Sequence, residues 1–390
     1  MLIIKMIPKT PGSGSFQSKL NQNRGHSASW RSLESTIDRL SADLTSQNMA
    51  RNVRSSLGSI PFPLTSRNSN ARFFATPQVE PTKCSVKENG IVMAYAANTN
   101  QGLVRNYNED RVSIILNISK PTSRGGEAWP RCSFFGVYDG HGGSACADFL
   151  RDHLHHFVIK NQHFPFNPKE ALKTGFRAAE KEFLELCKRS DPLERSGSCA
   201  VVMLIVGDNC YLANVGDSRA VMSGERGTKI YPLSKDHKPS DESEHQRIVA
   251  NGGRVYQNVG GSSGVLGPWR VFPGRLSVSR SFGDIEAKLT EYSGNPNVLT
   301  ADPEIKGFKL SEAYEFVVMC SDGVFDKMSN REVVESVWTT AAKKRYKNAH
   351  SVCGDCVENL IRNSLNKKSL DNVTVVMIAF EGFIKRLNFL

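Results

Sequence analysis

The chain has 390 residues, of which 39% are hydrophobic, and a formal net charge of +11. This length suits one large domain or two small ones, and the apolar content is enough to fill a core. No run of about 18 apolar residues is present, so we expect no membrane span. Nine cysteines, an odd number, are spaced without the pattern of a disulfide framework, and we expect a reducing compartment.

The first 89 residues differ in composition from the rest of the chain. Residues 1–79 carry ten Lys/Arg and three Asp/Glu, a net charge of +7, which leaves +4 for the remainder. This basic, Ser-rich and aperiodic composition predicts a disordered segment over residues 1–89. It also fits an organellar transit peptide, for which Arg72 to Ala75 would suit as a processing site.

We expect this segment to be a tail of a cytoplasmic or nuclear protein, and mitochondrial or other organellar import is the alternative. Because no aromatic–basic interleaving accompanies the charge, we expect no nucleic-acid partner. A third, weaker hypothesis is that the basic tail binds nucleic acid or anionic membrane, which salt-dependent binding of residues 1–89 would support.

From about residue 90 to residue 381 the sequence predicts one folded domain, followed by a short tail, 382–390. Apolar runs predict strands at 91–97, 111–116, 134–138, 316–320 and 373–380, and a β-meander over 200–206, 210–215 and 220–222. Helical periodicity predicts helices at 144–158, 168–187, 242–251, 330–343 and 353–365. Because strands outnumber crossover helices and the helices come in pairs, the pattern favours an α+β fold with antiparallel sheets.

Six carboxylates stand in four short blocks of this domain: Glu109 and Asp110, then Asp139, then Asp322 and Asp326, and finally Asp371. Most of these blocks lie next to an apolar, strand-like run. The core carries such strand ends inward, where a bare negative charge is costly, so each carboxylate needs a cationic partner or a shared metal ion. Ligands that are all oxygen suit Mg²⁺ or Mn²⁺ rather than zinc.

The residues around these carboxylates point to phosphoryl transfer. Two divalent ions about 3.5–4 Å apart can clamp the attacking and leaving oxygens of a phosphoryl displacement. Asp139 is the best candidate to bridge them, and Gly140 lets a backbone carbonyl approach an ion closely. His141 can donate a proton to a leaving alkoxide, and the guanidinium of Arg105 can bind a phosphate through two parallel hydrogen bonds.

Competing signatures are missing from the sequence. It has no GxxxxGK[ST] P-loop, no G-x-S-x-G elbow and no Cys-x₅-Arg loop, and the Asp139 block lacks the acid spacing of a calcium EF-hand. His153, His155 and His156 are expected to lie on an exposed helix face without a role in metal binding.

Taken in order, the blocks resemble the metal-dependent Ser/Thr protein phosphatases of type 2C. The resemblance covers about residues 90–381 and includes the run Asp139-Gly140-His141-Gly142-Gly143. It rests on the segments 105–110, 135–143, 196–200, 213–220, 236–239, 276–284, 320–326 and 371–374. It implies a catalytic domain over 90–381 with a four-layer αββα sandwich, in which helices flank two antiparallel β-sheets and a binuclear metal site lies at one end.

By motif match, the resemblance implies two Mg²⁺ or Mn²⁺ ions and a weaker third. Their ligands would be Asp139 as the bridge, Asp322 and Asp371 in one site, Glu109 and the Gly140 carbonyl in the other, Asp110 in support, and Asp217 and Asp326 with Asp322 in the third site.

The same resemblance implies the reaction. Arg105 would bind the substrate phosphate, and His141 would be the general acid. A metal-bridging hydroxide would attack the phosphorus of phosphoserine or phosphothreonine in line, without a covalent phosphoenzyme, and so reverse the action of protein kinases. We expect phosphoprotein substrates and a monomeric protein.

The alternative from another class is a pseudophosphatase that acts as a regulatory binding module. That hypothesis predicts a lost ligand, and none of the matched ligands is lost. The family usually has Thr where Cys199 stands, and we expect no loss of chemistry because this position belongs to a strand core. The glycine-rich stretch Gly252 to Pro273 matches the variable flap beside the active site, where we expect substrate choice to reside.

Overall fold

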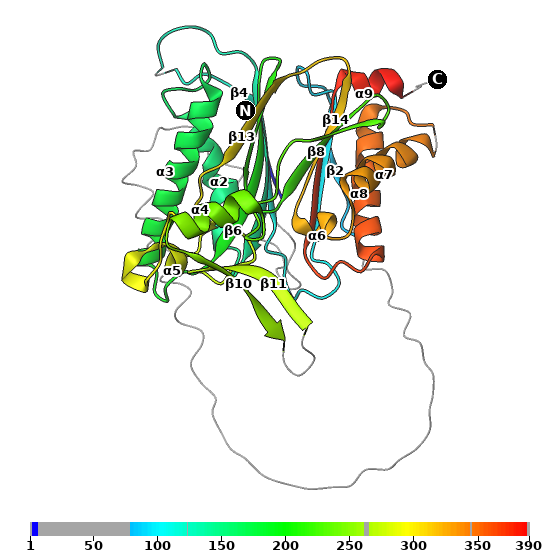
Figure 1. The fold of residues 1–390 in the computed structure, drawn as a ribbon. Coiled ribbons are helices and arrows are strands. Elements are labelled where there is room, and N and C mark those ends of the chain that lie inside the picture. The colour runs from blue at the N-terminus through cyan, green and yellow to red at the C-terminus, as the bar shows by residue number, and fades with distance from the viewer. Residues whose placement is uncertain (1, 7–78, 123, 261–264, 344, 388–390) are drawn as a thin grey trace, which may run out of the picture. The chain divides into compact units, whose positions relative to one another are not determined.

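Two antiparallel β-sheets lie face to face, and helices cover the outer face of each (Figure 1). The computed structural model describes residues 2–6, 79–122, 124–260, 265–343 and 345–387. The strands of the first sheet run in the order β1-β4-β5-β6-β7-β13, and β12 pairs with β6. Their bounds are β1 Leu2–Met6, β4 Arg111–Ile118, β5 Cys132–His141, β6 Gly197–Val206, β7 Asn209–Val215, β12 Phe282–Gly283 and β13 Glu304–Lys309.

The strands of the second sheet run in the order β2-β3-β15-β14-β8-β9. Their bounds are β2 Lys83–Cys84, β3 Ala94–Asn100, β8 Arg219–Gly224, β9 Lys229–Pro232, β14 Tyr314–Cys320 and β15 Val373–Ala379. A separate hairpin pairs β10 Arg254–Gly260 with β11 Val265–Phe272. The predicted α+β fold with antiparallel sheets is confirmed.

Helices α2 Ala145–Ile159 and α3 Pro168–Arg189 cover the first sheet, and α7 Asn330–Ala342 and α8 Ala349–Asn366 cover the second (Figure 1). The starts of α3 and α7 follow from local capping. The Asn167 side chain accepts the Glu170 N–H at the start of α3, and Ser329 and Glu332 form a reciprocal capping box at α7. The shorter helices are α4 Glu242–Ala250, α5 Ile285–Lys288, the 3₁₀ turn η1 Thr290–Tyr292, α6 Asp322–Phe325 and α9 Glu381–Arg386. None of the helices in the described part of the chain is both long and apolar enough to cross a membrane.

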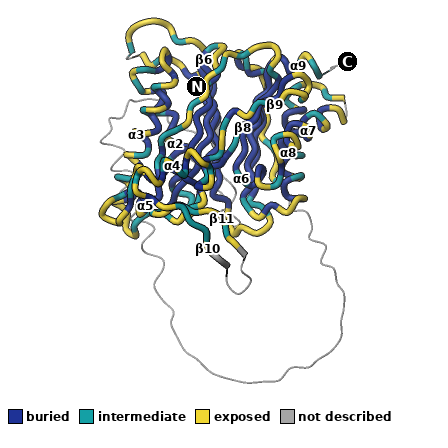
Figure 2. Tube along the Cα trace, viewed as in Figure 1, coloured by how far each residue is buried: buried dark blue, intermediate teal, exposed yellow. Residues whose placement is uncertain are grey.

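Apolar layers between these elements hold the sandwich together, and Figure 2 shows the strands as its most deeply buried part. Phe135 packs between the two sheets with Val317 and Val376. Its neighbour Phe134 points to the opposite face of the same strand and packs under α2 with Leu150. A third layer lies under α7 and α8. The αββα order of layers implied by the resemblance is therefore confirmed.

The predicted β-meander over 200–222 is wrong at its third strand. β6 and β7 pair in the first sheet, but β8 pairs with β14 and β9 in the second. Gly216 lies in the connection at φ +100°, and a Cβ there would lie 2.2 Å from the Sγ of Cys199, so the close turn requires glycine. The chain therefore changes sheets at this point, which places Asp217 in the crossover and not in a hairpin turn.

Two other predictions are wrong in detail. The strand expected at 91–97 is β3 at Ala94–Asn100, because the polar run Asn98 to Asn100 is buried in the strand and carries no hydrophobic signal. His155, expected on an exposed face, is buried and packs against the ring of Phe134, because the sheet and α3 together cover much of α2.

The segments outside the predicted core also contain regular structure. Most of the glycine-rich stretch 252–273 forms the hairpin β10–β11, and its residues 261–264 lie outside the described residues. Within the predicted N-terminal segment 1–89, β1 pairs with β4 and β2 pairs with β3, while residues 7–78, with the predicted processing site, lie outside the described residues. The predicted tail 382–390 begins inside α9, and its residues 388–390 are likewise not described.

Candidate metal centre

Asp139, Asp217 and Asp322 meet although they are far apart in the sequence. Asp139 lies near the end of β5, Asp217 in the crossover from β7 to β8, and Asp322 is the first residue of α6. One oxygen atom from each side chain lies within 4.8 Å of the other two. The backbone N–H of Asp322 also donates to Oδ2 of Asp139 over 3.3 Å, which fixes the start of α6 against the end of β5.

Burial makes this carboxylate cluster costly without a cation. Burial raises the pKa of Asp139 well above its ordinary value, and the negative charges of Asp322 and Asp110 raise it further. The pKa of Asp322 is raised in the same way, first by burial and then by Asp217 and Asp371. Burial also raises the pKa of Asp110 to about 6. A partly buried set of oxygen donors with several negative charges fits Mg²⁺ or Mn²⁺.

Close packing at Gly140 joins the first predicted block to the second. A Cβ on Gly140 would lie 2.6 Å from the carbonyl oxygen of Glu109. The Glu109 side chain accepts a hydrogen bond from the N–H of Gly143 at 2.6 Å, and the Glu109 N–H donates to Oδ1 of Asn372 at 2.9 Å. Glycine at position 140 therefore allows two predicted ligand residues to lie against each other.

The last block, residues 371–374, reaches both the buried and the exposed side of the cluster. Thr374 donates from Oγ1 to Oδ2 of Asp110 at 2.6 Å. On the exposed side, Nη2 of Arg105 lies 2.5 Å from Oδ2 of Asp371, and 48% of the Arg105 side chain is exposed. The predicted phosphate-binding residue is therefore paired with a predicted metal ligand.

Lys238 lies between the two outer residues of the predicted third site. Its Nζ lies 3.2 Å from Oδ2 of Asp217 and 3.9 Å from Oδ1 of Asp326. Asp217 is buried, whereas Asp326 is exposed. The ammonium group of Lys238 therefore lies close to both carboxylates and neutralises part of their charge.

His141 forms an ion pair with the buried Asp284. Its Nε2 lies 3.1 and 3.0 Å from the two oxygens of the Asp284 carboxylate. Burial lowers the pKa of His141, but the charge and the hydrogen bond of Asp284 outweigh burial and raise the pKa above its ordinary value. Gly197 leaves the room for this contact, since a Cβ there would lie 2.2 Å from Oδ2 of Asp284 and 2.4 Å from Nε2 of His141. The pair therefore favours the protonated imidazolium.

Sequence reasoning gave no role to Asp284 or Lys238, although both lie in segments that carry the resemblance. One signal was present for Asp284: it directly follows a short buried strand, β12, much as Asp139 lies near the end of β5. For Lys238 no such signal exists, because a lysine in a loop normally faces solvent.

Comparison with known proteins agrees with this fold. A sequence profile of the family described as Protein phosphatase 2C matches residues 94–373. The chain is 35% identical over 309 residues to protein phosphatase 2C homolog 2 of Hypocrea jecorina, an alignment that covers 78% of this chain and 66% of that protein. It is 37% identical over 255 residues to a probable protein phosphatase 2C of Caenorhabditis elegans, covering 64% of this chain and 66% of that protein.

Two solved structures show the same fold. The serine-threonine phosphatase 2C from Toxoplasma gondii is similar with a TM-score of 0.59 at 20% identity, covering 78% of this chain and all of that chain. A structure described as a C. elegans sex determining protein is similar with a TM-score of 0.61 at 22% identity, covering 76% of this chain and 66% of that chain.

The chain belongs to the protein phosphatase 2C family, because the family profile matches well over half of its length. The resemblance drawn from the ordered motifs is thereby confirmed. In the two relatives above, the aligned region spans 66% of their own length, a little under two thirds.

Proposed function

We propose that this chain is a Mg²⁺- or Mn²⁺-dependent protein phosphatase that hydrolyses phosphoserine and phosphothreonine in proteins. The observation that carries the proposal is the partly buried, oxygen-only cluster of Asp139, Asp217 and Asp322, with Arg105 and His141 beside it. Such a cluster has little structural use without a cation, because each carboxylate raises the cost of ionising the others.

The proposed metal ligands are the residues that match the ligand positions of the family motifs. Asp139 would be shared between two ions, Asp322 and Asp371 would complete one site, and Glu109 and the carbonyl of Gly140 would serve the other. Bound divalent ions supply Lewis acidity for the phosphoryl oxygens and lower the pKa of a bound water, which makes it a nucleophile near neutral pH.

The chain's own residues would orient the substrate and handle the proton. Arg105 would exchange the carboxylate of Asp371 for the substrate phosphate, to which a guanidinium can donate two parallel hydrogen bonds. With Nε2 of His141 directed at Asp284, Nδ1 is the nitrogen that can pass a proton to the leaving serine or threonine oxygen. Cys199 is a poor nucleophile, since burial and then the charges of Asp217 and Asp139 raise the pKa of its thiol well above the ordinary value.

Substrate choice would lie in the hairpin β10–β11. In Figure 1 this hairpin lies at the same end of the sandwich as α6, whose first residue is Asp322. It exposes the large apolar side chains of Leu266, Trp269 and Phe272, which offer a contact surface for the protein that carries the phosphate. Removing phosphate from such proteins would reverse protein kinase signalling.

The test is phosphate release from a phosphothreonine peptide by the full chain, with Mn²⁺ or Mg²⁺ and then with excess EDTA. We expect turnover that requires the metal and is lost in Asp139→Asn, while Asp208→Asn, which changes an exposed carboxylate in the β6–β7 turn, retains it. A folded protein that binds Mn²⁺ and releases no phosphate would overturn the proposal in favour of a regulatory binding module.

A further inference from the structure

Asp284, the partner of His141, sits in an unusual backbone conformation that its surroundings must hold. Its φ is +54°, in the left-handed region that residues other than glycine rarely adopt. Two backbone hydrogen bonds fix it: its N–H donates to the carbonyl of Ser196 at 3.0 Å, and its own carbonyl accepts the N–H of Ala287 at 2.8 Å. The carboxylate is held separately, since Oγ of Ser281 donates to its Oδ2 at 2.5 Å.

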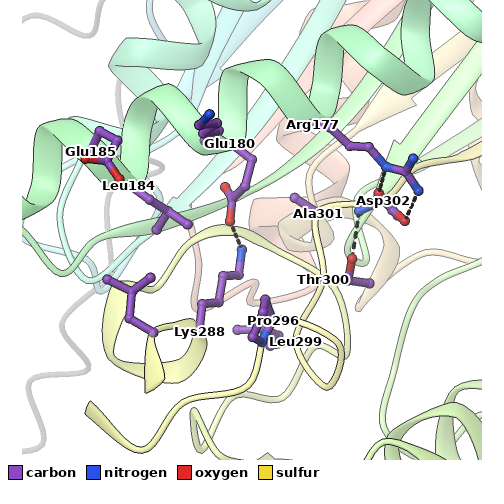
Figure 3. A pocket seen from close by; sticks show the side chains of 12 residues that line it. Arg177, Glu180, Leu184, Glu185, Lys288, Pro296, Leu299, Thr300, Ala301 and Asp302 are labelled. Carbon is purple, nitrogen blue, oxygen red and sulfur yellow. Dashed lines mark hydrogen bonds and ion pairs between the residues drawn. The ribbon is translucent and has the colours of Figure 1, made fainter. Parts of the chain in front are cut away.

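Behind Asp284 lies a buried ion pair that takes no part in the proposed chemistry. Glu180 comes from α3 and Lys288 from the end of α5, and Figure 3 shows the two side chains pointing at each other beside a cavity of about 320 Å³. Only 1% of the Lys288 side chain and 13% of the Glu180 side chain are exposed. Taking both charges out of water is costly, and a pair of apolar residues would fill the same space more cheaply.

The contacts of this ion pair lead directly to the segment that carries Asp284. Nζ of Lys288 donates to the carbonyl oxygen of Ser281 at 2.5 Å. Oε2 of Glu180 accepts the N–H of Gly283 at 2.9 Å. The pair therefore holds the residue that donates to the Asp284 carboxylate and the residue that immediately precedes Asp284.

A second ion pair in the same cavity lacks these contacts and provides the comparison. Arg177, on α3 like Glu180, pairs with Asp302 through distances of 2.6 and 2.7 Å (Figure 3). Both side chains are about half exposed. Arg177 and Asp302 thus join α3 to the same region of the chain, but at a position that does not touch residues 281–284.

We propose that Glu180 and Lys288 are positioning residues that act through Ser281 and Gly283 to hold Asp284, and through it His141, in the geometry for proton donation. This inference rests on the proposed function, in which His141 is the general acid. It predicts a defect in one step of catalysis only. A positioned acid matters for a leaving group that needs a proton, such as the threonine oxygen, and hardly matters for p-nitrophenolate, which leaves as a stable anion.

The test compares two substrates on each variant: a phosphothreonine peptide and p-nitrophenyl phosphate. In Lys288→Met and Glu180→Gln we expect kcat on the peptide to fall roughly tenfold or more, as for partial loss of a general acid, with a much smaller change on p-nitrophenyl phosphate. KM and Mn²⁺ affinity should stay close to those of the unchanged protein. Arg177→Ala is the matched control and should change neither substrate's kcat by more than about twofold.

His141→Ala separates a failure of this inference from a failure of the proposed function. If His141→Ala shows no difference between the substrates, the assigned acid is wrong and the proposed function loses that step. If His141→Ala shows the difference and Lys288→Met and Glu180→Gln do not, the positioning role is overturned.

The double variant Glu180→Gln/Lys288→Met covers the case in which a single change leaves an unpaired buried charge and unfolds the protein. Equal loss of both activities in the double variant would show that the ion pair has only a structural role, and this result would also overturn the inference. Loss confined to the peptide would support it.

Discussion

Arg105 and Asp371 form an ion pair across 266 residues of sequence, with Nη2 2.5 Å from Oδ2. The proposed function gives these two residues different tasks, because Asp371 would bind a metal ion and Arg105 a phosphate. In the structure the two side chains satisfy each other. Metal binding at Asp371 and the ion pair would therefore compete for the same carboxylate.

Arg105→Ala should weaken substrate binding and strengthen metal binding. A charged hydrogen bond contributes about 1.5–3 kcal/mol, so KM for a phosphothreonine peptide should rise by roughly tenfold or more. An exposed ion pair is worth only about 0.2–1 kcal/mol, so the Kd for Mn²⁺ should fall by no more than about fivefold. Steady-state kinetics and isothermal titration calorimetry measure the two effects.

Arg105→Lys is the control, because it keeps the charge beside Asp371 and loses the planar fork. It should raise KM while leaving the Kd for Mn²⁺ near its original value. Tighter Mn²⁺ binding in Arg105→Lys as well would contradict the competition between the ion pair and the metal.

The sequence predicts the parts of this site that are carried by short motifs. Asp139 and Asp322 each lie at the end of an apolar run that must be a buried strand, so their approach follows from burial and topology. The starts of α7 at Asn330 and of α3 at Pro168 were predicted correctly for a similar reason, because local capping residues set them, whereas α8 begins at Ala349, four residues before its predicted start. Such signals can be interpreted from the local sequence without knowing which strands pair.

The parts that sequence reasoning missed depend on contacts between distant segments. The family resemblance named Asp217 as a ligand, but its position was predicted wrongly as a hairpin turn, because the chain changes sheets at Gly216 and a glycine-containing turn fits a hairpin equally well. The pairing of His141 with Asp284 depends on the absence of a side chain at Gly197, in a third segment. The burial of Lys288 depends on its ion pair with Glu180 of α3. The sequence around each of these residues is typical of an exposed position on a helix.

Asp139→Asn should stabilise the metal-free protein while abolishing its activity. Burial and the neighbouring carboxylates Asp322 and Asp110 raise the pKa of Asp139 well above the ordinary value, so the ionised form destabilises the fold at neutral pH. Replacing it with a neutral amide of the same shape removes that cost. We expect Tm in EDTA to rise by roughly 2–4 °C for each kcal/mol recovered. Thermal scans with and without Mn²⁺ provide the measurement.

The same variant should lose most of the stabilisation by Mn²⁺ seen in the unchanged protein. Asp208→Asn serves as the control and should keep both the original Tm in EDTA and the full rise with Mn²⁺. A lower Tm for Asp139→Asn in EDTA would show that Asp139 contributes to the metal-free fold through its hydrogen bond to Asp322.

Acidification should stabilise the metal-free protein between pH 7.5 and about pH 5.5. The folded-state pKa of Asp110 is about 6, above the ordinary value of 3.8, so the folded state binds more protons than the unfolded state in this range. The penalty is fully present above the folded pKa and shrinks as the pH falls through it, at about 1.4 kcal/mol for each pKa unit. Tm in EDTA should therefore rise on acidification, and Asp110→Asn should flatten the profile.

Saturating Mn²⁺ should reverse this dependence, because protons compete with the metal for the carboxylates. Tm with Mn²⁺ should then fall as the pH is lowered from 7.5 to 5.5. The explanation would fail if the EDTA profile fell over the same range in the unchanged protein.

Lys238→Met should increase the affinity of the protein for an additional divalent ion. The Lys238 ammonium lies 3.2 Å from Asp217 and 3.9 Å from Asp326, the two carboxylates proposed for a weaker third site. It already neutralises part of their charge, and it would be repelled by a metal ion placed between them. Methionine keeps a similar stem without the charge, so calorimetry at high Mn²⁺ should detect a third ion with a Kd lowered by roughly tenfold.

Lys235→Met is the matched control, because Lys235 pairs with Asp241 and not with either of these carboxylates. An unchanged third-ion affinity in Lys238→Met, or an equal gain in Lys235→Met, would show that Lys238 does not compete with a metal ion between Asp217 and Asp326.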